Sequence, residues 1–183
     1  MASDSPIRHW HSEHAYFNRL LDLLQREVLR FHAGERPNYE LMLDIVRYLR
    51  EYGDDLHHPR EDAAFAILAQ RCPELRPTLA KLGQEHRVIA RAGDALVKQL
   101  AAVLDGSVIP RAEIEVAAAT YLVYYGNHIA REEEDVLPRA GQALTAEDWR
   151  AVRDAVPVVH DPLFGDHPQE RYRELRRRIS RES

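Results

Sequence analysis

Apolar side chains recur at intervals of three and four residues along two long segments, and a histidine interrupts each pattern once. The first pattern comprises Ile7, Trp10, Phe17, Leu21, Leu24, Val28 and Phe31. The second comprises Leu79, Leu82, Ile89, Gly93, Leu96, Leu100 and Val103. This spacing places the side chains on one face of an α-helix. The interruptions at His14 and His86 therefore put imidazoles on faces that we expect to be buried.

Two further segments have a helical pattern. Residues 39–71 carry Leu41, Ile45, Leu49, Tyr52 and Leu56 on one side, interrupted by Pro59. Residues 110–136 start with a proline, which suits the first helical position, and continue with Ile114, Ala117, Tyr121, Tyr125 and His128. Glycine or proline marks the breaks at residues 32–38, 70–77 and 105–110. The sequence therefore predicts an all-α fold, an up-down-up-down four-helix bundle over residues 1–140.

Residues 141–183 are expected to form a short helical extension packed on the bundle. Thr145 and Asp148 have the spacing of a capping box, and a loop and an arginine-rich helix follow. The arginines are at positions 171, 173, 176, 177, 178 and 181. Tyr172, Leu175 and Ile179 form an apolar stripe among them, which favours packing of the helix, or a homodimer contact, over nucleic-acid binding.

Length and composition limit the classes of protein that this chain can belong to. The 183 residues suit one domain, and 25 basic against 30 acidic residues argue against a surface built for nucleic acid. No apolar run is long enough to cross a bilayer, and residues 1–10 lack the features of a signal peptide. Cys72 is the only cysteine, which excludes an internal disulfide or a thiolate-rich metal site. We therefore expect a soluble, cytoplasmic protein whose partner is a small molecule or another protein.

Two histidine–glutamate pairs share a spacing of four residues, His57 with Glu61 and His128 with Glu132. Residues four apart lie on the same face of a helix, so each pair can bind one metal centre. His14 lies 17 residues before Phe31 at the end of the first helix, and His57 lies 18 residues after Tyr39 at the start of the second. In antiparallel helices, such matched separations place one histidine of each helix at the same level along the bundle axis, to within about 5 Å: His14, His57, His86 and His128.

A shared metal would satisfy these polar groups together, since unpaired polar groups are costly to bury. Imidazole with carboxylate suits iron, with zinc, manganese or cobalt as alternatives. Two six-coordinate ions bridged by both glutamates, with two histidines each, use roughly eight of about twelve coordination positions. Room remains for a bridging oxygen and for an exogenous ligand such as O2, NO or peroxide.

Several assignments stay open at this stage. Pro59 either kinks the second helix or ends it in a turn at residues 57–59. His58 with Asp62 has the same spacing as His57 with Glu61, and we expect only one of these pairs to face the core. Five further histidines are expected to face solvent or to lie around the site: His9, His11, His32, His160 and His167. We expect the next acidic residues, Glu133, Glu134 and Asp135, to form a solvated charged face. Tyr121, Tyr124 and Tyr125 are expected mainly in the core, where one hydroxyl could donate to a bound oxygen species.

Four segments resemble the hemerythrin-like, HHE cation-binding family: EHAYFNRLLDLL (13–24), HHPREDAAF (57–65), QEHRVIA (84–90) and HIAREEEDVLP (128–138). The resemblance follows the bundle in order, and residues 161–175 are similar to tails of bacterial members. The resemblance implies a four-helix bundle that holds a non-haem di-iron centre. The functions that it implies are oxygen carriage, sensing, or the repair of iron centres under stress. The ligands that it implies are His14, His57, Glu61, His86, His128 and Glu132.

One departure from the family concerns the third helix. Oxygen-carrying hemerythrins have a second histidine four residues after the first, whereas this chain has Ala90 there. The ligand set resembles the iron-centre repair and stress-response branches more closely, and His58, Glu85 or His11 could supply an extra ligand. The predicted function is therefore a di-iron protein that binds or reacts with O2, NO or peroxide. The alternative is a non-enzymatic regulatory or structural module in which the metal chiefly holds the bundle together. An enzyme such as an iron oxidase or peroxidase is less expected, because no separate acid–base pair near the ligands identifies a substrate.

Overall fold

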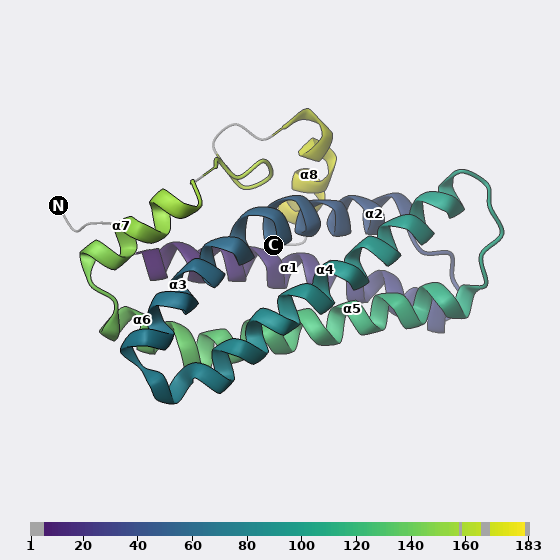
Figure 1. Cartoon of the computed structure of the whole chain (residues 1–183). Coiled ribbons are helices and arrows are strands. Elements are labelled where there is room, and N and C mark those ends of the chain that lie inside the picture. Colours follow the sequence, from purple (N-terminus) through teal and green to yellow (C-terminus); the bar gives the residue numbers. More distant parts are fainter. Residues whose placement is uncertain (1–5, 158, 166–168, 182–183) are drawn as a thin grey trace.

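The computed structural model describes residues 6–157, 159–165 and 169–181, and within these ranges every regular element is a helix. The expectation of an all-α fold is therefore confirmed. Three long helical segments are α1 (Pro6–His32), α4 (Arg76–Leu104) and α5 (Arg111–Arg131). A fourth is continuous and consists of α2 (Tyr39–Tyr48), the π-helix η1 (Leu49–His57) and α3 (His58–Arg71). Figure 1 shows these segments side by side.

Shorter elements complete the described chain. The 3-10 turn η2 (Pro73–Leu75) leads into α4, and a second π-helix, η3 (Glu132–Val136), joins α5 to α6 (Leu137–Ala143). The C-terminal part contains α7 (Ala146–Ala155), the 3-10 turn η4 (Glu170–Tyr172) and α8 (Arg173–Arg181). None of the described helices is both long and apolar enough to pass through a membrane.

The second helical segment passes through Pro59 without a break. His57 and His58 both have right-handed helical backbone angles, and the N–H of His58 donates to the carbonyl of Gly53, five residues earlier. Pro59 then takes one of the first positions of α3, where its missing N–H matters least. The alternative that residues 57–59 end the helix in a turn is therefore wrong, because the π-helical turn accommodates the proline.

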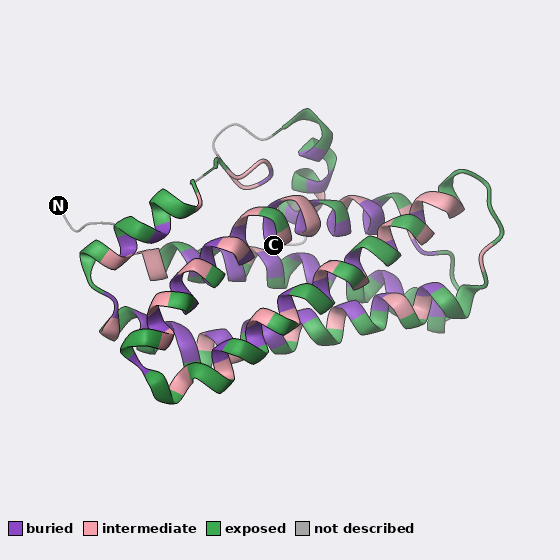
Figure 2. Ribbon diagram, in the orientation of Figure 1, coloured by how far each residue is buried: buried purple, intermediate pink, exposed green. Residues whose placement is uncertain are grey.

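The four segments pack through their apolar faces, as Figure 2 shows by the buried residues on the facing sides of the helices. Helix α4 contacts α2 and α5, and α1 also contacts both of these helices. The buried apolar residues form two clusters: one includes Phe17, Tyr52, Ile89 and Ile129, and the other includes Trp10, Ala64, Leu82 and Val136.

A polar layer separates these two clusters at the same level on every segment. On α1, His14 lies between Trp10 of one cluster and Phe17 of the other; on α4, His86 lies between Leu82 and Ile89. On the second segment, His57 and Glu61 lie between Tyr52 of one cluster and Ala64 of the other. On the fourth segment, Glu132 lies between Ile129 and Val136. The matched heights predicted for these residues therefore correspond to one layer within the bundle.

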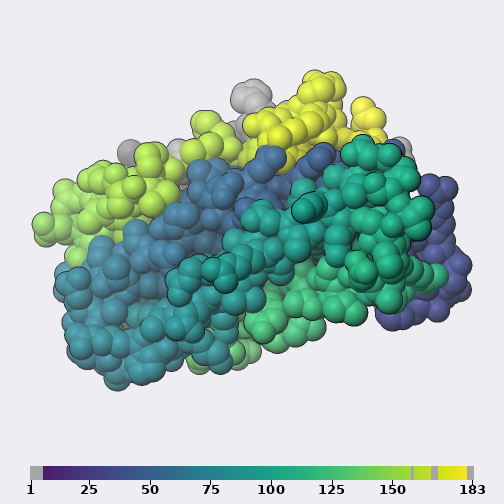
Figure 3. Space-filling model, turned by 45° about the vertical axis from the view of Figure 1, so that its right-hand side comes forward, coloured from purple at the N-terminus to yellow at the C-terminus, as the bar shows by residue number. Residues whose placement is uncertain are grey.

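The C-terminal elements contribute to both clusters. Thr145 and Asp148 form the predicted capping box of α7, and the ring of Trp149 lies edge-on to Trp10 with centroids 5.4 Å apart. Tyr172, Leu175 and Ile179 are buried in the cluster that contains Phe17. Figure 3 shows the C-terminal segment lying against the helices of the N-terminal half. A domain boundary near residue 140 stays a prediction.

Candidate metal centre

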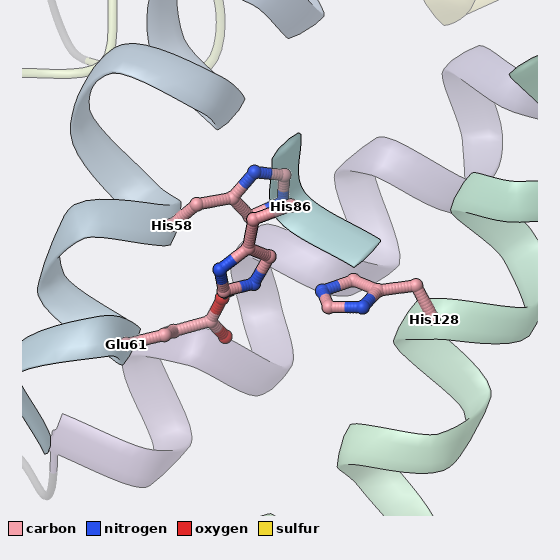
Figure 4. Close-up of side chains that lie close together, drawn as sticks. All are labelled: His58, Glu61, His86 and His128. Atoms are coloured by element: carbon pink, nitrogen blue, oxygen red, sulfur yellow. Dashed lines mark ion pairs between the residues drawn. The ribbon is translucent and has the colours of Figure 1, made fainter. Parts of the chain in front are cut away.

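Seven ligand-type side chains lie in the polar layer, and none is more than 5% exposed. They are His14 on α1, His57 at the end of η1, His58 and Glu61 on α3, His86 on α4, His128 on α5 and Glu132 at the start of η3. Figure 4 shows four of them, His58, Glu61, His86 and His128, converging from three helical segments. All six residues that the sequence predicts as ligands are thus brought together, and His58 joins them.

Glu61 directs its two carboxylate oxygens to different histidines. Its Oε1 lies 3.0 Å from Nε2 of His57 and 3.3 Å from Nε2 of His14. Its Oε2 lies 3.6 Å from Nε2 of His86. A carboxylate in this position can bridge two ions, with one oxygen for each.

Glu132 is arranged in the same way from the opposite side of the layer. Its Oε1 lies 3.0 Å from Nε2 of His128 and 3.6 Å from Nε2 of His86. Its Oε2 lies 3.6 Å from Nε2 of His14. Each glutamate therefore faces His14 of α1 with one oxygen and His86 of α4 with the other.

Ligand atoms of six of the seven side chains, all but Glu132, fall into two groups in which they lie within 4.8 Å of one another. One group contains His14, His57 and Glu61, and the other contains His58, His86, His128 and Glu61. Ligand atoms that share one octahedral ion at about 2.1 Å lie roughly 3 Å apart. The six separations above run from 3.0 to 3.6 Å, near this value, so the donor set fits two ions that share the glutamates.

Six buried ligand atoms have no hydrogen-bond partner among the described residues. They are both carboxylate oxygens of Glu61, both of Glu132, and Nε2 of His86 and His128. A buried polar atom without a partner costs about 1–3 kcal/mol, so six of them at one place would be a large penalty. A cation between them would satisfy all six, and this is the observation that best fits a metal centre.

Each of the five histidines also has a carboxylate beside its other ring nitrogen, Nδ1. The partners are Glu133 for His14 (2.7 Å), Glu13 for His57 (2.8 Å), Asp54 for His58 (3.0 Å), Asp62 for His86 (2.9 Å) and Glu85 for His128 (3.3 Å). A carboxylate at Nδ1 fixes the proton there and leaves Nε2 free to bind a metal. For His14, His57, His86 and His128 this contact is a hydrogen bond that orients the ring, whereas Nδ1 of His58 and Oδ1 of Asp54 are not aligned for one.

The carboxylates raise the affinity of two histidines for protons. Burial lowers the pKa of His14, but the hydrogen bond to Glu133 and the nearby carboxylates of Glu61 and Glu132 outweigh burial and raise it to about 10. Burial likewise lowers the pKa of His86, but the hydrogen bond to Asp62 and the nearby carboxylates of Glu132 and Glu61 outweigh burial and raise it to about 11. Without a metal, protons supply the positive charge that the glutamates require, and metal binding would release these protons.

His58 corrects the expectation that only one of the two neighbouring histidines faces the core. His57 is 0% and His58 is 3% exposed, because the π-helical turn carries both rings into the layer. Asp62, the expected partner of His58, has a half-exposed side chain and contacts His86 instead. Of the three residues considered for an extra ligand, His11 is exposed and paired with Glu133, and Glu85 contacts His128 and Arg131.

The sequence analysis missed a buried network beside His57. The carboxylate of Glu13 accepts hydrogen bonds from Tyr52 (2.6 Å), from Arg60 (2.9 Å) and from Nδ1 of His57. Glu13 precedes His14 directly, and that position on a buried helix was the available signal. Glu133 was also missed, since it was expected on a solvated face and instead contacts His14.

The remaining candidates are distributed as follows. The hydroxyls of Tyr121 and Tyr125 are buried without a hydrogen-bond partner among the described residues, whereas Tyr124 is 44% exposed. His9 is half-exposed beside Glu13, and His32 and His160 are exposed. His167 lies outside the described residues.

One comparison with known proteins gave a match. The family model described as the hemerythrin HHE cation binding domain matches residues 5–140, which contain all seven side chains of the polar layer. Neither the comparison with curated proteins nor the comparison with solved structures gave a match. From the extent of the family match, the chain belongs to the hemerythrin HHE cation-binding family.

Proposed function

We propose that this chain is a non-haem di-iron protein that binds or reacts with O2, NO or peroxide in a sensing, scavenging or stress-repair role. Its centre would lie inside an up-down-up-down four-helix bundle. The proposed ligands are His14, His57, Glu61, His86, His128 and Glu132. The observation that carries the proposal is the set of six buried carboxylate and imidazole atoms that share one layer and lack other partners.

The chemistry of the ligands favours iron over the alternatives zinc and manganese. Imidazole with bridging carboxylate suits iron, and Cys72 lies in the apolar cluster around Trp10, apart from the ligands. Iron bound there would exchange electrons with a small oxidant or bind a diatomic molecule directly. The chain's own part is to hold the imidazoles by their carboxylate partners and to exclude bulk water.

The surroundings of the layer support a small, weakly polar ligand. The ring of Phe17 lies edge-on to His57 at 5.0 Å, and Phe65 stacks on His86 at 6.1 Å. The two apolar clusters lie on either side of the layer along the bundle. A diatomic molecule or peroxide fits these surroundings better than a large charged substrate does.

Metal content and absorption spectra test this function directly. The protein is purified without oxygen, metal is counted per chain, and spectra are recorded before and after adding air and then NO. We expect two irons per chain, a charge-transfer band that appears in air, and a separate change with NO. One zinc per chain with no spectral change would overturn the redox function.

The alternative function is a structural or regulatory module in which the metal chiefly holds the bundle together. The observation in its favour is that the ligands come from four helical segments, so that a bound ion would cross-link all of them. Metal binding to a folded state adds its binding free energy to stability. The substitution of Glu61 described in the Discussion separates this alternative from a reactive centre.

A further inference from the structure

We propose that a cavity between α1, α3 and α7 binds a small aromatic carboxylate. The cavity has a volume of about 220 Å³, and the three helices that supply its walls lie together at one end of the molecule (Figure 1). None of the seven ligand-type side chains of the polar layer lines it. The proposal therefore goes beyond the metal-binding function and does not depend on it.

Two indole rings form adjoining apolar walls of this cavity. The rings of Trp10 and Trp149 lie nearly at right angles, with an interplanar angle of 77° and centroids 5.4 Å apart. Val152 adds a third apolar wall, and all three side chains are buried. A flat ring between such walls can stack on one indole and lie edge-on to the other, and both arrangements are favourable. Since a cavity of about 150 Å³ holds one benzene ring, this one has room for a ring with a short acid chain.

The charged side chains around the cavity select an anion. Arg60, Arg153 and His9 line it, and no carboxylate of the described residues does so. Arg60 and His9 already contact Glu13, at 2.9 Å and 3.3 Å. Arg153 is exposed in the last turn of α7 and makes no ion pair or hydrogen bond with any described residue. Its guanidinium is therefore the free donor that pairs with the carboxylate of the ligand.

The ring of Trp10 separates the cavity from the polar layer. It lies edge-on to the ring of His57, with centroids 6.2 Å apart. His57 is 0% exposed and does not line the cavity. A ligand in the cavity therefore contacts Trp10 without reaching the imidazole of His57, and its binding can be measured whether or not metal is present.

Tryptophan fluorescence tests this site, because the chain has two tryptophans and both line the cavity. The probes are phenylacetate, the uncharged phenylacetamide of the same shape, and the cationic phenethylamine. Each is titrated into the full chain with excitation where only indole absorbs, and calorimetry gives the stoichiometry. We expect a saturable change with phenylacetate at one molecule per chain. Phenylacetamide should bind about 10-fold more weakly, and phenethylamine should not bind.

Arg153→Gln separates the contribution of charge from that of the apolar walls. The variant should bind phenylacetate only as weakly as phenylacetamide, and it should bind phenylacetamide as the wild type does. The matched control is Arg150→Gln, which replaces an exposed arginine of α7 outside the cavity and should change neither affinity. Circular dichroism shows whether each variant is folded before it is titrated.

Three results would overturn the proposal: no saturable change in the wild type, equal affinities for the acid and the amide, or an undiminished preference for the acid in folded Arg153→Gln. A tryptophan signal that changes with protein concentration as the chain dimerises would show that a second copy covers the cavity, and this also overturns it. If Arg153→Gln does not fold, the comparison of acid and amide on the wild type decides.

Discussion

At the scale of single residues, Glu61 has the widest influence on the centre, because its two oxygens face histidines of different groups. In the proposed di-iron centre, removing it would take one ligand from each ion position at once. A histidine such as His128 belongs to one group alone, so its removal affects one position. Substitution of either glutamate would therefore distinguish a shared two-metal centre from two separate sites.

Glu61→Ala is expected to reduce iron content from two per chain to less than one and to abolish the response to air and NO. Because the bundle has two apolar clusters apart from this layer, the metal-free variant should keep its helical circular dichroism. Exposed Glu134→Ala is the matched control and should keep both irons. Unfolding of Glu61→Ala together with the loss of metal would favour the structural module instead.

Glu13→Gln is expected to destabilise the protein by about 3 kcal/mol, because it leaves the charge of Arg60 buried without its partner. The two side chains are 3% and 5% exposed and are joined at 2.9 Å. Urea unfolding of the metal-free protein measures the change, with Glu134→Gln as the exposed control. Equal stability of the two variants would mean that the buried pair contributes nothing.

At the scale of elements, the π-helix η1 decides which side chains enter the centre, and Gly53 lies within it. A Cβ atom at this position would overlap the hydroxyl of Tyr125 but would lie 3.7 Å from its ring carbon Cζ, an ordinary contact. Helix η1 and α5 therefore approach each other closely at this glycine. The position of His58 depends on that approach, since its N–H bonds to Gly53.

Gly53→Ala is expected to destabilise the fold by about 1–3 kcal/mol through this overlap and to lower metal content. The double variant Gly53→Ala/Tyr125→Phe removes the hydroxyl and should restore most of the stability. Thermal unfolding of the two single variants and the double variant gives the coupling between them. Additive effects would show that the two residues do not meet as described.

Helix α7 is expected to lose part of its stability in acid. The hydrogen bond from Arg71, and then the one from the Thr145 backbone, lower the pKa of Asp148 from its usual 3.8 to about 2. A group whose pKa is lowered on folding stabilises the fold above its unfolded pKa, so this contribution is complete above about 3.8 and is lost toward about 2. The carboxyl signal of Asp148 in a pH titration by NMR measures it. Arg71→Gln should move the midpoint to higher pH, and an unchanged midpoint would contradict the described contact.

At the scale of the whole molecule, the C-terminal segment shares its core with the helices that carry the ligands. Tyr172 donates to Glu51 at 3.0 Å, and Tyr48 donates to Asp161 at 2.9 Å. Leu163 and Leu175 are buried in the same cluster as Phe17. We therefore expect this segment and the matched family region to unfold together.

Leu175→Ala is expected to cost about 2–5 kcal/mol, because the side chain is only 1% exposed and its removal leaves a cavity. The variant should unfold in one transition at a lower temperature and keep the metal content of the wild type. Differential scanning calorimetry with metal analysis measures both. Two separate transitions would instead indicate that residues 141–183 form an independent unit.

Much of the site follows from periodicities that a sequence displays directly. The three-four rhythm around His14 and His86 identifies buried helix faces, because burial of one face requires that spacing. The four-residue spacing of His57 with Glu61 and of His128 with Glu132 directs each pair to one side of a helix. Equal separations from the chain breaks then bring these residues to one height.

The remaining features depend on how the helices meet in space. No local pattern in the sequence indicates that residues 49–57 adopt π-helical hydrogen bonds, and the inward position of His58 follows from that turn. The carboxylates beside His14, His57 and His128 come from other helices, so only their packing selects Glu133, Glu13 and Glu85 as partners. The sequence by itself determined the helices and six of the seven converging side chains, since these follow from spacing along one helix. Tertiary structure decided the seventh side chain and the partners of the rings of His14, His57, His86 and His128, because hydrogen bonds between segments have no period along the chain.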